Sequence, residues 1–190
     1  IGENYGEHEH FKVLIASLDR GKGKEDLEGR LKEIEEVCIE RKELNPHMKG
    51  TLDALKIIFS DVKVNEDVEL FKHFAMINTA KCCVGDSMAQ APWKFFDNCK
   101  EYTKGEIDIL QPDIIITQGR CAAEVFELLY PELKNKDEWY ERKGEINIGD
   151  NHKALVICSV HPSARGKWKN IWQGFIKNRL PEIIKDRKRK

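Results

Sequence analysis

Short, strongly apolar segments alternate along the chain with longer stretches whose apolar residues recur every three or four positions. Four of the short segments are rich in β-branched residues and apolar on both faces, which is typical of buried parallel strands. They are KVLIASL within residues 11–18, FAMIN at 74–78, DIIITQ at 113–118 and ALVICSV at 154–160. The pattern predicts four buried strands.

The stretches between these strands have the period of amphipathic helices. Helices are predicted over residues 24–44, 51–59, 93–110, 119–129 and 171–187, with Asn45-Pro46 ending the first and a kink near Pro181 in the last. Strands alternating with helices predict the α/β class, as a three-layer α/β/α fold around a parallel sheet of about four strands. We expect a single domain over residues 1–190, with a helical insertion at about 24–44 and a basic C-terminal helix at about 168–190.

Polar or turn-forming residues follow each predicted strand: Asp19, Asn78, Gly119 and His161. In folds of this class, ligands bind beyond the carboxyl ends of the parallel strands. Side chains that several separate segments bring to one edge of the sheet therefore predict a functional site at that edge.

The formal net charge of −1 conceals an uneven distribution of charge. Residues 164–190 carry a net charge of +8, so the remainder carries −9. A basic stretch that contains Trp168 and Trp172 suits a phosphate backbone. A solvated helix with a frayed basic end is the alternative interpretation of the same stretch.

The six cysteines have the irregular spacing of a protein from a reducing compartment rather than that of a disulfide framework. No apolar run reaches the length of a membrane-spanning helix, and no basic-plus-apolar signal segment precedes the first strand. We expect a cytoplasmic protein with no membrane partner, acting as a monomer.

Four short segments carry a resemblance to a known family. They are Ser17-Leu18-Asp19-Arg20-Gly21, Pro46-His47-Met48, Asn78-Thr79-Ala80-Lys81-Cys82 and His161-Pro162-Ser163. In this order they resemble the motifs of the uracil-DNA glycosylase superfamily, and most closely those of its iron–sulfur branch, families 4 and 5, over about residues 12–163. The resemblance implies a base-excision repair enzyme that extrudes a deaminated base from single- or double-stranded DNA and hydrolyses its N-glycosidic bond, with uracil as the first expected substrate.

The resemblance implies two catalytic residues, Asp19 and His161. A carboxylate at Asp19 would orient the attacking water and stabilise the positive charge that develops on the sugar. An imidazole at His161 would donate a hydrogen bond to the departing base as negative charge builds on it. The Glu and the Pro of the family 4 motif Gly-Glu-x-Pro-Gly are absent around Asp19, where an Asx turn or a helix cap is the structural alternative.

The resemblance also implies a substrate-binding set: Ser17, His47, Asn78, Ser163 and Arg165. Asn78 would read the Watson–Crick edge of the flipped base, which in hypoxanthine and xanthine also pairs an acceptor with an N–H. His47 stands where most relatives have an aromatic residue that stacks on the base. Ser163 and Arg165 would contact phosphates.

Cys82 and Cys99 stand where family 4 has the third and fourth ligands of a [4Fe–4S] cluster. Four thiolates are normally needed, and the family's other two precede the first strand. We expect those two upstream of Ile1. Loss of the cluster, substitution by Cys38 and Cys83, and a zinc site formed by Cys82, Cys83, Cys99 and a histidine are the open alternatives.

Two other functions stay open on the sequence. A diverged member of the superfamily could bind nucleic acid without excising a base, as the altered first motif and His47 suggest. A different α/β enzyme could act on free nucleosides or another small substrate, and its binding would depend weakly on salt and show no preference for DNA.

Overall fold

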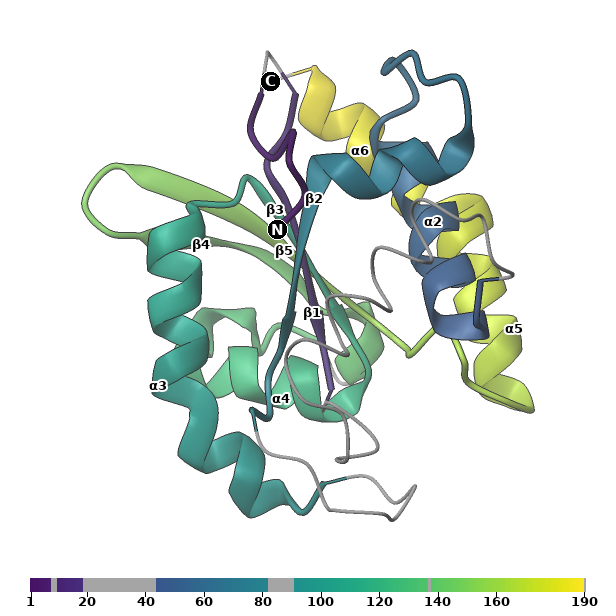
Figure 1. Ribbon diagram of the computed structural model, residues 1–190. Coiled ribbons are helices and arrows are strands. Elements are labelled where there is room, and N and C mark those ends of the chain that lie inside the picture. The colour runs from purple at the N-terminus through teal and green to yellow at the C-terminus, as the bar shows by residue number, and fades with distance from the viewer. Residues whose placement is uncertain (8–9, 19–43, 82–90, 137, 190) are drawn as a thin grey trace.

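The residues that the structure describes form a central sheet of five strands, in the order β2-β1-β3-β5-β4 (Figure 1). The structure is a computed structural model and describes residues 1–7, 10–18, 44–81, 91–136 and 138–189. Four of the strands run parallel and are the four predicted from the sequence. The strands are β1 (Val13–Ser17), β2 (Phe74–Asn78), β3 (Ile114–Gln118), β4 (Lys143–Ile148) and β5 (His152–Ser159).

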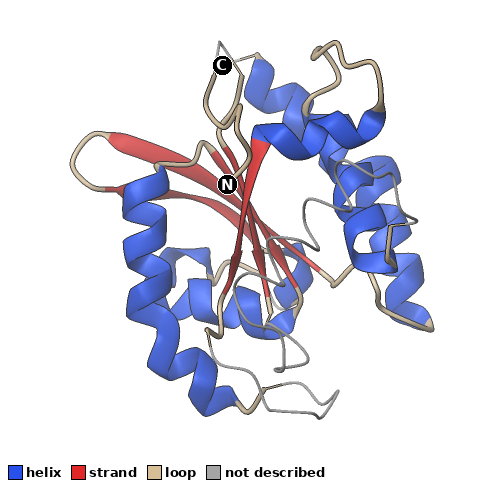
Figure 2. Ribbon diagram, viewed as in Figure 1, coloured by secondary structure: helices blue, strands red, loops and turns tan. Residues whose placement is uncertain are grey.

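Helices cover both faces of this sheet, which confirms the predicted three-layer α/β/α fold (Figures 1 and 2). One face carries α2 (Pro46–Ile58), α5 (Lys167–Gly174) and α6 (Leu180–Lys188), and the other carries α3 (Trp93–Leu110) and α4 (Arg120–Leu129). Shorter helical segments are η1 (Asp67–His73), η2 (Pro131–Leu133), η3 (Trp139–Glu141) and the π-helical η4 (Phe175–Arg179).

The central strands are apolar on both sides because each side packs against a helical layer. In β1, Val13 and Ile15 belong to the cluster beneath α2, whereas Leu14 and Ala16 belong to the cluster on the opposite face. All four side chains are fully buried. The continuous apolar run therefore follows from two-sided burial.

The edge strand β4 lies outside the four segments that the sequence predicts as strands. It pairs with β5 in antiparallel orientation. Only Ile146 and Ile148 are buried, and they alternate with the exposed Glu145 and Asn147. This alternation is the pattern of a strand with one face on the core, and the charges along the strand suit an edge, where they discourage pairing with another chain.

The connections after β1 and β3 leave the sheet in opposite directions. The chain passes from β1 to β2 on one side through α2, and from β3 toward β5 on the other through α4. The carboxyl ends of β1 and β3 are neighbours, because Ala16 pairs with Thr117. They form the topological switch point at which open α/β sheets commonly bind ligands.

The C-terminal basic stretch forms α5, η4 and α6 without interruption. Pro181 has no N–H to donate to the preceding turn, and the π-helical turn lies just before it. The predicted insertion at 24–44 lies, apart from Leu44, outside the described residues. Within the described parts of the chain, no helix is both long and apolar enough to cross a membrane.

Candidate active site

Polar side chains lie at the carboxyl ends of β1 and β3, where the switch point predicts a site. Ser17 ends β1 and is 3% exposed, and Gln118 ends β3 and is fully buried. A buried carboxamide must be hydrogen-bonded, or its desolvation costs stability. The hydrogen-bond partners of Gln118 therefore show how the side chains of the site are arranged.

His47 reaches this point from the first turn of α2. The sequence placed the start of this helix at residue 51, but Pro46 opens it and the Asn45 side chain accepts a hydrogen bond from Met48 N at 2.9 Å. Proline is favoured at the first helical position and asparagine at the N-cap. The Asn45-Pro46 pair thus starts a helix and places His47 over the strand ends.

His47 and Gln118 are joined by a short hydrogen bond, with Nε2 of the imidazole 2.6 Å from Oε1 of the amide. The Ser17 Oγ lies 3.3 Å from the same Nε2. The amide nitrogen of Gln118 donates to Thr51 Oγ1, one helical turn along α2, at 3.0 Å. Since the amide oxygen can only accept, Nε2 of His47 carries the proton.

The pKa of His47 is lowered from its usual value. Burial is the main cause because it penalises the charged ring, and the hydrogen bond to Gln118 offsets the decrease only in part. Together with the hydrogen-bond pattern, this favours a neutral His47 protonated on Nε2.

His161 packs against His47 on the side of the loop that follows β5. The two ring centroids are 4.5 Å apart and the ring planes are inclined by 35°. The backbone N–H of Ser163 donates to Nδ1 of His161 at 3.2 Å. Nδ1 therefore carries no proton, and in the neutral ring the proton is on Nε2. Such a ring can donate a hydrogen bond to an oxygen on which negative charge develops.

Asn78 lies beside Ser17, because the two residues pair at the ends of β2 and β1. The next residue, Thr79, donates its hydroxyl to the Ser17 carbonyl at 2.7 Å, and its backbone N–H donates to the same oxygen at 3.0 Å. The ends of β1 and β2 are thereby tied together. The structure thus brings Ser17, His47, Asn78 and His161 to one edge of the sheet.

Two of the predicted site residues, Asp19 and Cys82, lie outside the described residues. Cys99 lies on α3, is 6% exposed and accepts a hydrogen bond from Lys81 N at 3.4 Å. In the described part of the chain, no three or more His, Cys, Asp or Glu side chains gather to hold a metal ion. These residues alone do not supply the four thiolates of a cluster, so the cluster stays a prediction.

The basic residues of the C-terminal stretch differ in whether they form ion pairs. Arg187 and Lys188 on α6 pair with Glu145 and Asp61, at 2.7 and 2.9 Å. Ser163, Arg165, Lys167 and Lys169, in contrast, are exposed on the loop after His161 and at the start of α5. The Lys167 ammonium lies 4.8 Å from the centroid of the Trp168 ring. Arg165, Lys167 and Lys169 therefore place exposed positive charge next to His161, and Lys177, Lys185 and Arg189 are exposed farther along the stretch.

Two residues of the site, Gln118 and Thr51, were not among the candidates from the sequence. Gln118 is the last residue of the predicted strand 113–118, and a polar side chain at that place was a usable signal. Thr51 carried no comparable signal, because a threonine in an amphipathic helix is common.

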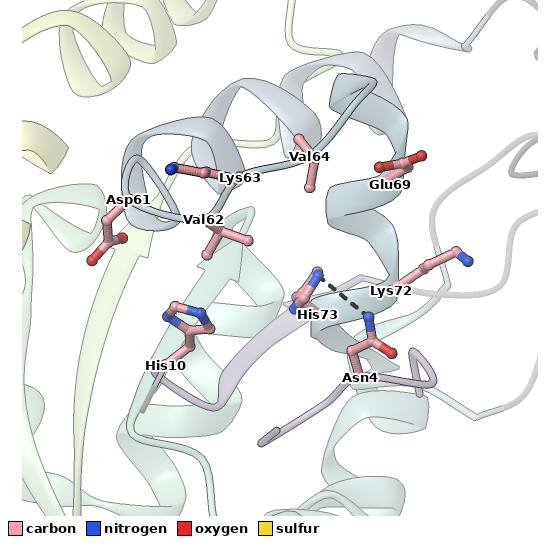
Figure 3. A pocket seen from close by; sticks show the side chains of 9 residues that line it. All are labelled: Asn4, His10, Asp61, Val62, Lys63, Val64, Glu69, Lys72 and His73. Carbon is pink, nitrogen blue, oxygen red and sulfur yellow. Dashed lines mark hydrogen bonds between the residues drawn. The ribbon is translucent and has the colours of Figure 1, made fainter. Parts of the chain in front are cut away.

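A separate hollow of about 430 Å³ lies at the opposite edge of the sheet (Figure 3). Its lining includes His10, Asp61 and His73, and the Asn4 amide nitrogen lies 3.5 Å from His73 Nε2. These residues surround the amino ends of β1 and β2, about 16 Å from the carboxyl ends for strands of five residues. The hollow is therefore not part of the candidate site.

The glycine at position 50 lets α2 approach the loop that follows His161. A Cβ built on Gly50 would lie 2.4 Å from Cβ of Pro162 and 3.3 Å from Trp172. We expect Gly50→Ala to lower the free energy of unfolding by about 1 to 2 kcal/mol, because overpacking outweighs the gain in helix propensity. Urea denaturation measures this change.

The matched control is Gly105→Ala in the middle of α3, where an added Cβ has no atom within 4 Å. This variant is expected to gain about 0.5 to 1 kcal/mol, since only the helix propensity changes. Equal stability of the two alanine variants would contradict the proposed close approach.

The low pKa of His47 also predicts how stability depends on pH. Below about pH 6.5, the usual histidine pKa, the unfolded chain binds a proton at this residue before the folded protein does. The free energy of unfolding therefore decreases as the pH falls from about 6.5 toward the folded-state pKa. Urea denaturation between pH 7.5 and 5.5 should show a shallower decrease for His47→Phe than for the wild type. An identical slope in both proteins would show that His47 is not the group responsible.

Comparison with protein families gives one result that covers nearly the whole chain. The model of the uracil DNA glycosylase superfamily matches residues 4–182. The match includes the strand ends with Ser17, Asn78 and Gln118, as well as the loop with His161. No curated protein matches the chain. By this match over most of its length, the chain belongs to the uracil DNA glycosylase superfamily.

Proposed function

We propose that the protein is a DNA glycosylase that hydrolyses the N-glycosidic bond of a deaminated base, with uracil as the first substrate to test. Membership of the superfamily indicates a repair function of the glycosylase type. The observation that carries the proposal is the state of His161: Ser163 N donates to its Nδ1, so the neutral ring has its proton on Nε2. That proton can be donated to a carbonyl oxygen of the leaving base.

In the proposed reaction the bond between C1′ of the sugar and the base nitrogen breaks, and its electron pair leaves with the base. A hydrogen bond from His161 Nε2 stabilises the negative charge on the base oxygen. Water adds its oxygen to C1′ and releases a proton, which neutralises the departing base. Asp19, which precedes Arg20 and Gly21, is the proposed residue that orients this water. The products are a free base and an abasic site.

Base recognition is assigned to the residues at the ends of β1 and β2. Asn78 has a donor and an acceptor that fit the Watson–Crick edge of uracil. His47 offers a flat ring, and Ser17 a hydroxyl, at the same edge of the sheet. Extrusion of the base from the duplex costs a few kcal/mol, and contacts between the protein and the DNA backbone must offset that cost.

We assign these contacts to the DNA backbone to the exposed basic residues that follow His161. Arg165 lies on the loop before α5, and Lys167 and Lys169 lie in the first turn of α5, close in sequence to the proposed catalytic histidine. We place the chain in the family 4/5 branch on the segment Asn78-Thr79-Ala80-Lys81-Cys82. A cluster at Cys82 and Cys99 stays a prediction, which iron and acid-labile sulfide analysis of anaerobically purified protein would test.

The test is an alkali-cleavage assay on labelled single- and double-stranded DNA with uracil, hypoxanthine or xanthine at one position. Cleavage at that position identifies the excised base, because alkali breaks the strand at an abasic site. Unmodified DNA of the same sequence is the control. Salt-dependent binding of DNA without any cleavage would replace the proposal with a non-catalytic, nucleic-acid-binding member of the superfamily.

A further inference from the structure

The polar contacts between α2 and the end of β3 form a closed network around His47. Gln118 is the centre of this network: its amide oxygen faces His47 Nε2 at 2.6 Å, and its amide nitrogen donates to Thr51 Oγ1 at 3.0 Å. Both groups of the amide are thereby used. With His47 protonated on Nε2, a 180° turn of the amide would set two N–H groups against each other inside a buried site.

The orientation of the His47 ring follows from this arrangement. One end of the ring is held by Gln118, and one face packs against His161 with 4.5 Å between centroids. Among the described residues, Ser17 also contacts the ring, with its Oγ 3.3 Å from Nε2. Within the described residues, His161 is the titratable side chain that faces His47, and Ser17, Thr51 and Gln118 are uncharged. The His47 ring is therefore held against His161 by an amide on β3.

We propose that Gln118 is a positioning residue for base release, acting by fixing the ring of His47, which in turn supports the face of His161. The inference rests on the proposed function, because it assigns His161 the contact with the leaving base. Gln118 itself touches neither the substrate nor the reacting atoms. Its effect is on where the proton donor of His161 points.

The experiment compares Gln118→Leu with Gln118→Glu in the full chain. Leucine removes the acceptor, so no hydrogen bond from residue 118 fixes the orientation of the His47 ring. We expect the maximal rate of excision to fall by about 10- to 100-fold, with KM changed by less than about 3-fold. Glutamate keeps an oxygen toward His47, and the Thr51 hydroxyl can donate to its other oxygen. Gln118→Glu is therefore expected to recover most of the rate. Gln111→Leu, at the C-terminal end of α3, is the matched control.

A second readout is independent of activity. Nitrogen-15 NMR of the imidazoles, without DNA, is expected to show His47 protonated on Nε2 in the wild type and a mixture of tautomers in Gln118→Leu. In Gln118→Glu the carboxylate is expected to raise the pKa of His47. The ring signals of His161 are expected to shift in both variants, because its centroid lies 4.5 Å from that of His47.

The outcomes separate this inference from the proposed function. If the wild type excises no base but the NMR spectra change as expected, the coupling of Gln118, His47 and His161 stands and the glycosylase function fails. If the wild type is active and Gln118→Leu is as fast as Gln111→Leu, the positioning role is refuted. A wild-type His47 protonated on Nδ1 also refutes it, as do His161 ring signals that stay unchanged in Gln118→Leu.

Discussion

Replacement of His161 by alanine is expected to slow base release by about 100- to 1,000-fold, because it removes the donor to the developing negative charge. The hydrogen bond from Ser163 N to Nδ1 holds the ring with its proton on Nε2, so this donor is already oriented before the substrate arrives. A preoriented donor is stronger in the transition state than in the ground state, and its loss lowers the rate rather than the affinity. Single-turnover excision from uracil-containing DNA measures the effect, with the dissociation constant for DNA measured in parallel.

The control for this variant is His152→Ala. His152 lies at the start of β5, at the opposite end of the strand, where its Nε2 is 2.8 Å from the Pro112 carbonyl oxygen. It is expected to keep the wild-type excision rate. A His161→Ala protein that is folded and excises as fast as His152→Ala would remove His161 from the mechanism. A loss of DNA affinity with an unchanged rate would assign it to binding instead.

The strands that helices cover on both faces could be predicted from the sequence. Runs such as IIIT in β3 are apolar on both faces because helices cover both faces, and such runs are visible without knowledge of the fold. β4 was missed because its buried Ile146 and Ile148 are separated by residues that face solvent. A short edge strand of this kind has the local composition of a loop.

The start of α2 shows a second limit of prediction from sequence. Asn45-Pro46 was interpreted as the end of one helix, and the same two residues are the N-cap and first residue of the next. Proline disfavours a helix before it and favours one that begins with it, so local chemistry allowed both interpretations. Only the packing of α2 on the sheet distinguishes them.

The candidate site was predictable to the extent that it follows strand ends. Ser17 and Asn78 are neighbours because parallel strands end together, and the motif His161-Pro162-Ser163 identified the loop. The contact of His47 with Gln118 was not predictable, since it joins residues 71 positions apart and depends on how far α2 extends over β3. The roles of Asp19, Cys82 and Cys99 stay predictions.

Arg179 is expected to be the largest single contributor to stability near the site. It lies in the π-helical turn η4, and its guanidinium donates to four backbone carbonyl oxygens. Three of these belong to Tyr140, Glu141 and Arg142 at η3, and the fourth, at 3.0 Å, belongs to Cys158 on β5. Burial lowers the pKa of the guanidinium, but a guanidinium remains charged at every physiological pH. One side chain thus joins η4, η3 and the strand that leads to His161.

Arg179→Met is expected to lower the free energy of unfolding by about 3 kcal/mol, because it leaves several partly buried carbonyl oxygens without donors. Arg179→Lys should lose less, since an ammonium restores the charge but cannot form the same forked contacts. Lys177→Met is the control, because Lys177 lies in the same turn and is exposed. It is expected to change stability by less than about 0.5 kcal/mol.

Urea denaturation of the wild type and the three variants measures these differences. Equal midpoints and slopes for Arg179→Met and Lys177→Met would refute the role of Arg179. Because Cys158 precedes His161 by three residues, the destabilised variant should also excise base more slowly at temperatures where it is still folded.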